Sequence, residues 1–421
     1  MTLIKTIYES GLSLAEEKIR EIVEIQTPSS LYEGKRVLVL TPDGTRTCPL
    51  PMMVRILREV IGARTARLDF MVALGTHPIM TDEEILKLYG IGAAGRKEPF
   101  GQSSFFCHRW DEPSTFQRIG ELAEEEVATI SGGLLRERVP IDINKKIFEY
   151  DLILILGPIF PHEVVGFSGG AKYLFPGISG GEFLHFFHWL GALITCRKII
   201  GRKETPVRRV IHRALEQIDL PIHCLAMVVD PEARLRGLFV GDVREAWSAA
   251  ADLSATIHIV EKERPFRIVL GRTPEMYDEI WVAGKVVYKL EQVVAPGGTL
   301  IVYAPHIREI SRTWGDQIEK IGYHVRDYFL ARPEACSGIP RGVLAHATHV
   351  CGTGRYENGV EKPDVHVVLA TAISEKTCRR IGLGYLDPAK VRIDDYRDRE
   401  EEGVLFVDHA GETLYRLAGG G

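Results

Sequence analysis

Three short apolar runs, each followed by a loop that carries polar side chains, limit most strongly what this chain can fold into. The runs are Arg36–Leu40, Arg67–Leu74 and Leu152–Leu156, and their nearly unbroken apolar character is typical of strands buried on both faces. An amphipathic helical pattern over Pro51–Ile61 lies between the first two. This succession of buried strand, glycine- or proline-containing loop and helix predicts an α/β fold with a parallel sheet.

The chain has 421 residues, which is enough for two α/β domains with separate cores. We predict an N-terminal domain over residues 1–262, a second domain over residues 263–402, and a C-terminal hairpin and tail over residues 403–421. An acidic helix is expected over Gly120–Ala128. The active site is expected in the cleft between the two domains.

Composition argues against several classes of partner. The formal net charge is -5 and no basic run occurs, so nucleic acid is not expected as a partner. No apolar segment reaches the length of a membrane helix, and the N-terminus lacks the apolar core of a signal peptide. We therefore predict a cytoplasmic protein with no membrane contact. The seven cysteines include no CxxC pair that would indicate a thiolate zinc site or an iron–sulfur cluster.

Residues that can carry chemistry are concentrated between Pro158 and Trp189. A glycine-rich loop lets backbone N–H groups approach an anion and a lysine adds positive charge, although such a loop is often only a tight turn. Two histidines three residues apart on a predicted helix could ligate a metal, or could pack among the neighbouring aromatic residues. The crowding favours a site for an anionic, metal-bearing ligand. The residues concerned are His162, Ser168, Gly169, Gly170, Lys172, His185 and His188.

Polar residues follow each of the three predicted strands. Asp43, Thr45 and Arg46 follow the first, His77 follows the second, and His162 follows the third. The carboxyl ends of parallel strands lie at one edge of a sheet, so these distant residues can converge. Two histidines on opposite sides of a substrate suit paired acid/base chemistry, and an arginine suits a carboxylate.

In these blocks the sequence resembles the nickel-pincer-nucleotide-dependent lactate racemases and their 2-hydroxyacid racemase and epimerase relatives. The matching segments occur in the family's order and close to its spacing between about residues 36 and 305. They are Asp43-Gly-Thr-Arg46, Gly75-Thr-His77, His162 with Lys172 in FSGGAK, His188, and Lys285 in DEIWVAGK.

The resemblance implies two α/β domains and a cofactor, the nickel-pincer nucleotide (nickel pyridinium-3,5-bisthiocarboxylic acid mononucleotide), which separate cofactor-synthesis proteins would supply. It also implies a small 2-hydroxy acid as substrate. By this resemblance Lys172 is joined to the cofactor, and His188 is the protein's ligand to nickel. His77 and His162 exchange the hydroxyl proton of the substrate while hydride passes to the cofactor ring.

Further site residues follow from the same match. We expect Arg46 and Lys285 to hold the substrate, with Trp281 in the wall of its pocket. Residues expected to bind the cofactor are Asp43, Thr45, Ser168, Gly169 and Gly170.

The sequence departs from the lactate enzymes beside the substrate lysine. A glutamine expected three residues before Lys285 is replaced by Val282, next to Trp281. We therefore expect a 2-hydroxy acid larger than lactate, such as a sugar acid, to be epimerised at C2. One alternative is lactate racemase proper.

The sequence is also compatible with other classes of protein. A hydrolase could hold a metal through His162, His185 and His188, with Glu163 or Glu182 as general base. A protein that only stores or senses the nucleotide is another alternative, although paired acid/base histidines argue against it. A nicotinamide-dependent dehydrogenase is disfavoured because no GxGxxG motif follows an early strand.

Overall fold

The computed structural model describes residues 4–7, 13–92, 95 and 100–419, and the chain forms two compact units. The first unit comprises Met1–Phe160, Ser168–Leu184 and Arg208–Thr256. The second comprises Pro161–Phe167, His185–Val207 and Ile257–Gly421, so two short segments of the first half of the chain belong to it. Each unit contains a largely parallel sheet with helices, which confirms the predicted α/β class.

The first unit is built on a seven-stranded sheet with the order β1-β11-β10-β7-β2-β3-β4. Neighbours pair in parallel from β10 to β4, whereas β11 is antiparallel to both β10 and β1. The three apolar runs are thus the adjacent strands β7, β2 and β3. The bounds are β1 Ile4–Ile7, β2 Arg36–Thr41, β3 Arg67–Val72, β4 Phe105–Cys107, β7 Leu152–Pro158, β10 Ile222–Val229 and β11 Leu235–Asp242.

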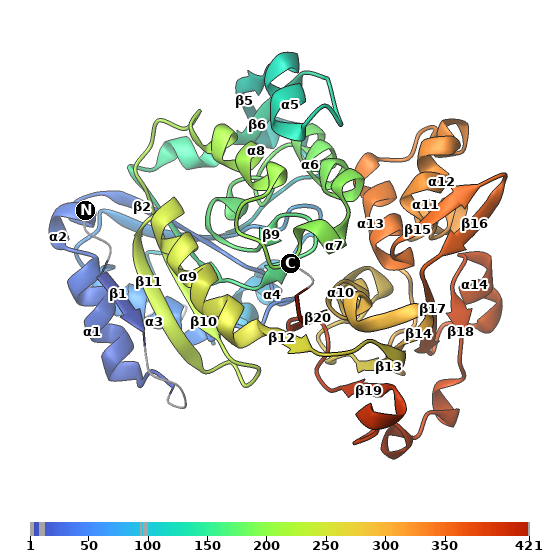
Figure 1. The fold of residues 1–421 in the computed structure, drawn as a ribbon. Coiled ribbons are helices and arrows are strands. Elements are labelled where there is room, and N and C mark those ends of the chain that lie inside the picture. Colours follow the sequence, from blue (N-terminus) through green and yellow to red (C-terminus); the bar gives the residue numbers. More distant parts are fainter. Residues whose placement is uncertain (1–3, 8–12, 93–94, 96–99, 420–421) are drawn as a thin grey trace. The chain divides into compact units, whose positions relative to one another are not determined.

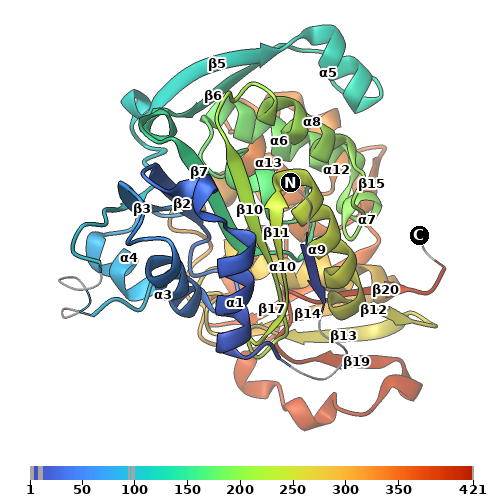
Figure 2. The same ribbon diagram turned by 90° about the vertical axis from the view of Figure 1, so that its left-hand side faces the viewer.

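Helices cover both faces of this sheet (Figure 1 and Figure 2). Apolar residues of α1 and α3 form one core with inward-facing residues of β2 and β3, such as Val37 and Phe70. On the opposite face α9 packs so closely that a Cβ at Gly237 would lie 2.5 Å from Leu253 Cδ2. The helices are α1 Glu16–Gln26, α2 Ser29–Tyr32, α3 Leu50–Val60, α4 Asp82–Leu88, α5 Glu124–Ser131, α8 Pro206–Leu215 and α9 Val243–His258.

The predicted acidic helix over Gly120–Ala128 is partly wrong. Its first residues belong to strand β5 (Phe116–Leu122), which pairs antiparallel with β6 (Val139–Asn144), and α5 begins only at Glu124. Pairing with β6 outweighs the local preference, and Arg118 of β5 forms an ion pair with Asp142 of β6. The acidic residues instead occupy the first turn of α5, where the helix dipole favours negative charge.

The second unit contains a five-stranded, fully parallel sheet with the order β18-β17-β14-β13-β19. Its strands are β13 Phe266–Arg272, β14 Val294–Ala304, β17 Val365–Thr371, β18 Gly384–Tyr385 and β19 Val404–Val407. Small two-stranded pairs are β8 Pro161–His162 with β9 Gly166–Phe167, and β15 Gly354–Glu357 with β16 Val360–Pro363.

The helices of the second unit include α10, most of whose residues are buried. Helix α6 begins in the first unit and continues into the second. The bounds are α6 Gly181–Ile194, α7 Cys196–Ile199, α10 Ile280–Leu290, α11 Gly315–Ile321, α12 Arg326–Ala331, α13 Arg341–Cys351 and α14 Glu375–Arg380. None of the helices in the described part of the chain is long and apolar enough to cross a membrane.

The predicted C-terminal hairpin over residues 403–421 is wrong in its strand pairing. Strand β19 pairs in parallel with β13, and β20 (Leu414–Leu417) pairs in parallel with β12 (Ile259–Lys262). The two strands of the tail therefore extend two different sheets instead of pairing with each other. The alternating apolar pattern at the C-terminus marks strands, but it does not identify their partners.

Candidate active site

The loops after two of the three predicted strands meet in the first unit. Strands β2, β3 and β7 are neighbours and run in the same direction, so the loops that follow them leave the same edge of the sheet. The loop after β2 carries Asp43, Thr45 and Arg46, and the loop after β3 carries His77. These two loops meet through a direct contact between Asp43 and His77.

Asp43 is the centre of this contact. One carboxylate oxygen, Oδ2, is hydrogen-bonded to Nδ1 of His77, and the other, Oδ1, accepts from the backbone N–H and the hydroxyl of Thr45 at 3.0 and 2.7 Å. Burial opposes ionisation of Asp43, but the His77 ring, the Thr45 hydroxyl and the charge of Arg46 together hold the pKa of this carboxyl well below its usual range. A carboxylate fixed on Nδ1 leaves Nε2 as the nitrogen of His77 that can face a substrate.

The backbone of His77 is also anchored. The indole N–H of Trp110 donates to the carbonyl of His77 at 2.8 Å, and the N–H of His77 donates to the carbonyl of Leu74 at 2.9 Å. Arg46 donates to the carbonyl of Thr45 at 3.1 Å. The sequence did not indicate Trp110, because nothing in its local pattern distinguishes it from a packing residue.

The glycine loop returns to the end of β7. Ser168 Oγ accepts from the N–H of Phe160 at 2.9 Å, and the N–H of Ser168 donates to the carbonyl of Phe160 at 2.8 Å. Gly170 begins the short 3-10 helix η3 (Gly170–Tyr173), which contains Lys172. The structure thus places Ser168, Gly169, Gly170 and Lys172 in the first unit, together with Asp43 and His77.

The second unit holds the other predicted histidines. His162 is buried in β8, and its Nδ1 accepts from the N–H of Val164 at 3.2 Å and lies 3.4 Å from Glu163 Oε2. His185 and His188 follow on α6, both half-buried. Burial, followed by the charge of Arg341, lowers the pKa of His185 to about 4, and its buried Nδ1 has no hydrogen-bond partner.

The two predicted substrate residues of the second unit lie four residues apart on α10, on one side of the helix. The ring of Trp281 stacks on that of His346 at 3.8 Å, and the ammonium group of Lys285 lies 4.6 Å from the ring centre of Tyr277. Val282, in the place of the expected glutamine, is buried.

Sequence reasoning missed His346 of α13. Tyr288 hydroxyl and His346 Nδ1 are hydrogen-bonded at 2.9 Å. Burial, followed by the nearby His349 and His188, keeps the pKa of His346 well below its ordinary value, so the ring is neutral. A signal was present, because His346 and His349 repeat on α13 the three-residue spacing of His185 and His188.

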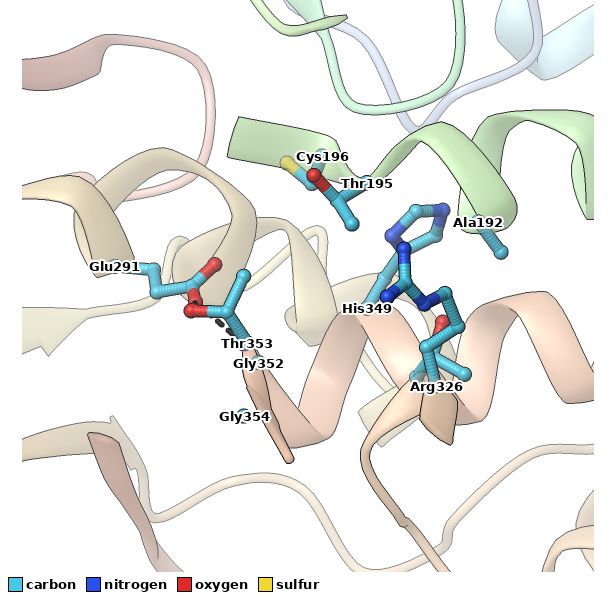
Figure 3. A pocket seen from close by; sticks show the side chains of 10 residues that line it. Ala192, Thr195, Cys196, Glu291, Arg326, His349, Gly352, Thr353 and Gly354 are labelled. Atoms are coloured by element: carbon cyan, nitrogen blue, oxygen red, sulfur yellow. Dashed lines mark hydrogen bonds between the residues drawn. The ribbon is translucent and has the colours of Figure 1, made fainter. Parts of the chain in front are cut away.

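A cavity of about 50 Å³ in the second unit is lined by other residues than the predicted site residues (Figure 3). At one end Glu291 accepts from the N–H and hydroxyl of Thr353 at 2.6 Å, and His349 and Arg326 line the other end. A cavity of this volume has room for a few water molecules and is too small for a 2-hydroxy acid. None of the predicted site residues lines it.

The structure also tests the three-histidine metal site of the hydrolase alternative. Within the described residues, no three histidine, cysteine, aspartate or glutamate side chains are grouped so that they could hold a metal ion. His162, His185 and His188 are all among these residues, so this alternative lacks its ligand set.

Comparison with known proteins agrees with the pattern of loop residues. Residues 12–199 match the family described as the lactate racemase N-terminal domain. This region of the chain is therefore similar to the N-terminal domain of lactate racemases. The matched region contains Asp43, His77, His162, Lys172 and His188.

Two lactate racemases are similar in sequence to this chain. The enzyme of Lactiplantibacillus plantarum is 28% identical over 284 residues, and that of Thermoanaerobacterium thermosaccharolyticum is 26% identical over 281 residues. Each match covers 65% of this chain and 61% of the relative, so the chain spans less than two thirds of the length of these enzymes.

Two solved structures share the fold over nearly the whole chain. The crystal structure of a Thermotoga maritima protein superposes with a TM-score of 0.89 at 34% identity, covering 97% of this chain and 100% of the other. The lactate racemase apoprotein of T. thermosaccharolyticum superposes with a TM-score of 0.72 at 19% identity, covering 99% and 100%. The second likeness concerns the fold alone.

Proposed function

We propose that this protein is a racemase or epimerase that inverts C2 of a 2-hydroxy acid with the nickel-pincer nucleotide as cofactor. The observation that carries the proposal is the Asp43–His77 pair, formed by two strand-end loops within the part of the chain that matches the lactate racemase N-terminal domain. A buried carboxylate bonded to a histidine is an arrangement that can take up and return a proton.

The protein side chains that could ligate a metal suit a cofactor that itself supplies most of the metal's ligands. A structural or hydrolytic zinc site takes three or four protein ligands, which the described residues do not group together. The nickel-pincer nucleotide would need one imidazole from the protein, and His188 is half-buried against Phe187 with their ring centres 4.9 Å apart. When bound, the cofactor supplies a pyridinium ring that accepts hydride from C2 and returns it.

The side chains of the first unit have three proposed tasks. His77 takes the hydroxyl proton of the substrate, and Asp43 stabilises the imidazolium that results. Arg46 binds the substrate carboxylate, because a guanidinium fork matches two carboxylate oxygens. Lys172 is the attachment point of the cofactor, with Thr45, Ser168, Gly169 and Gly170 around it.

The side chains of the second unit complete the proposal. His162 exchanges the hydroxyl proton on the other face of the substrate, and the charge of the adjacent Glu163, 3.4 Å from its Nδ1, stabilises the imidazolium that results. Lys285 adds a second positive charge for the substrate carboxylate. Trp281 and Val282 offer an aromatic face and an apolar surface in place of an amide, which favours a substrate longer than lactate, such as a sugar acid.

A chiral product screen tests the proposal. The protein is produced together with cofactor-synthesis proteins, and nickel content and intact mass are measured first. Single stereoisomers of lactate, malate and a C6 sugar acid are then incubated with it and followed by chiral chromatography. We expect inversion at C2, fastest with the sugar acid. Fastest turnover of lactate would support lactate racemase proper, and no inversion of any 2-hydroxy acid by nickel-loaded protein would contradict the proposal.

A further inference from the structure

Trp247 lies in an otherwise small-residue stretch of α9 and contacts the glycine loop twice. Its indole N–H donates to the carbonyl of Ser168 at 2.9 Å. Its side chain also covers Gly170, because a Cβ at that position would lie 2.9 Å from Trp247 Cβ. The indole is only 2% exposed, so the Ser168 carbonyl would lack a buried partner if the N–H were removed.

Arg208 of α8 reaches the same loop from a fully buried position. Its guanidinium carbon lies 4.1 Å from the ring centre of Trp247, and Nη1 donates to the carbonyl of Gly169 at 3.4 Å. The same carbonyl accepts from the backbone N–H of Lys172 at 3.3 Å. Arg208 and Lys172 are therefore linked through a single acceptor.

The loop needs such support because its backbone conformation is restrictive. Gly169 and Gly170 have φ of 75° and 58°, in the left-handed region that favours glycine. A Cβ at Gly169 would lie 2.2 Å from Ile159 Cδ1. Close packing therefore explains why glycine occupies both positions, in addition to any approach of the backbone to an anion. Glycine gives the chain access to this conformation but does not hold it there.

We propose that Trp247 and Arg208 are positioning residues, which hold the Ser168–Lys172 backbone in the conformation that presents Lys172 for attachment to the cofactor. The inference rests on the proposed role of Lys172, and both residues act through their contacts with the loop backbone. Side chains from outside the loop contact three consecutive loop residues. Two side-chain donors bind the carbonyls of Ser168 and Gly169, and an aromatic side chain covers Gly170.

Two measurements on Trp247→Phe test this. In the protein without cofactor, hydrogen exchange of the peptide covering residues 168–178 should become roughly five- to tenfold faster, because one buried hydrogen bond is lost. Exchange of the β2 and β3 peptides should not change. During production with cofactor-synthesis proteins, the fraction of Lys172 that carries the added mass should rise more slowly than in the wild type. Arg208→Lys, which keeps the charge but shortens the reach to Gly169, should change both readouts in the same direction.

Ser254→Ala is the matched control. Ser254 lies on the same helix, and its hydroxyl donates to the carbonyl of Ile159 at 2.8 Å, so this variant also loses a buried bond to a backbone carbonyl, but outside the loop. The proposal would be overturned if Trp247→Phe showed the same hydrogen exchange and the same rate of Lys172 modification as the wild type. It would also be overturned if Ser254→Ala, at the same melting temperature as Trp247→Phe, showed the same changes as Trp247→Phe. An unmodified Lys172 in active wild-type protein would instead overturn the attachment role, while the exchange data would still test whether Trp247 holds the loop.

Discussion

His77 in the first unit and His346 in the second are the same side chain in opposite surroundings. The side chain of His77 is 29% exposed and is bonded to the carboxylate of Asp43. His346 is 7% exposed, lies against the ring of Trp281 and is bonded to the hydroxyl of Tyr288. A carboxylate stabilises an imidazolium, whereas an aromatic, buried surrounding destabilises it.

The difference separates histidines that can cycle a proton from those that serve as neutral rings. His162 is buried and its Nδ1 accepts from the N–H of Val164, but like His77 it has a carboxylate near Nδ1, that of Glu163. His185, His346 and His349 have pKa values lowered chiefly by burial and suit packing or a pocket wall. Each histidine of the proposed acid/base pair thus has a carboxylate neighbour.

The largest effect is expected for His77→Ala. General acid/base loss typically lowers a rate by about 10²–10⁴-fold. Because each stereoisomer uses one histidine on entry and the other on exit, the rates in both directions should fall together, and His162→Ala should do the same. Initial rates from each pure stereoisomer measure this. The exposed His366, replaced by alanine, is the control, and a loss in only one direction would contradict the paired roles.

His188→Ala should come next, with loss of nickel. Positions three apart on a helix diverge by about 60°, so only one of His185 and His188 need face the metal. Nickel per protein, measured by mass spectrometry after dialysis, should fall far below the wild-type value in His188→Ala and should remain near it in His185→Ala. Equal retention in both variants would show that the ligand is misassigned.

Asp43→Asn should have an intermediate effect. The amide keeps the shape of the carboxylate but cannot stabilise an imidazolium, and a hydrogen bond to a charged group contributes about 1.5–3 kcal/mol, or roughly 10- to 150-fold in rate. Stability should change in a defined pH window. Since the pKa of Asp43 is lowered by folding, its stabilisation is complete above the ordinary carboxyl pKa of about 4 and is lost as the pH falls further.

Urea unfolding between pH 7 and pH 3 measures this dependence on Asp43. The acid-induced decrease in stability should be smaller in Asp43→Asn than in the wild type. If Asp43→Asn turns over substrate as fast as the wild type, the carboxylate of Asp43 is not what makes His77 able to exchange a proton.

The smallest effect is expected for His349→Gln. Burial lowers the pKa of His349 to about 4, whereas an unfolded chain protonates it near pH ~6.5. The unfolded state therefore binds more protons between these values, and wild-type stability falls as the pH drops from ~6.5 towards 4. In His349→Gln this decrease should be smaller, and in the exposed control His366→Gln it should match the wild type. Urea midpoints at pH 7.5 and 5 provide the comparison.

Sequence reasoning recovered what depends on local pattern and strand direction. The buried strands were visible as apolar runs, and the meeting of Asp43 with His77 followed from the common edge of parallel strands. Contacts made by single side chains from distant elements were not predictable. Trp110, Trp247 and Arg208 each reach a loop 33 to 79 residues away, with no local signal. The C-terminal pairing was mispredicted because alternation fits either a hairpin or two edge strands.

The fate of the hydrogen at C2 distinguishes hydride transfer from removal of a proton. Substrate deuterated at C2 is converted in ordinary water, and the product is analysed by mass spectrometry and NMR. If C2 hydrogen leaves and returns as hydride while His77 and His162 move only the hydroxyl proton, the label should largely remain at C2 of the inverted product. If either histidine instead removed a proton from C2, the label would exchange with solvent, and its complete loss during turnover would contradict the account.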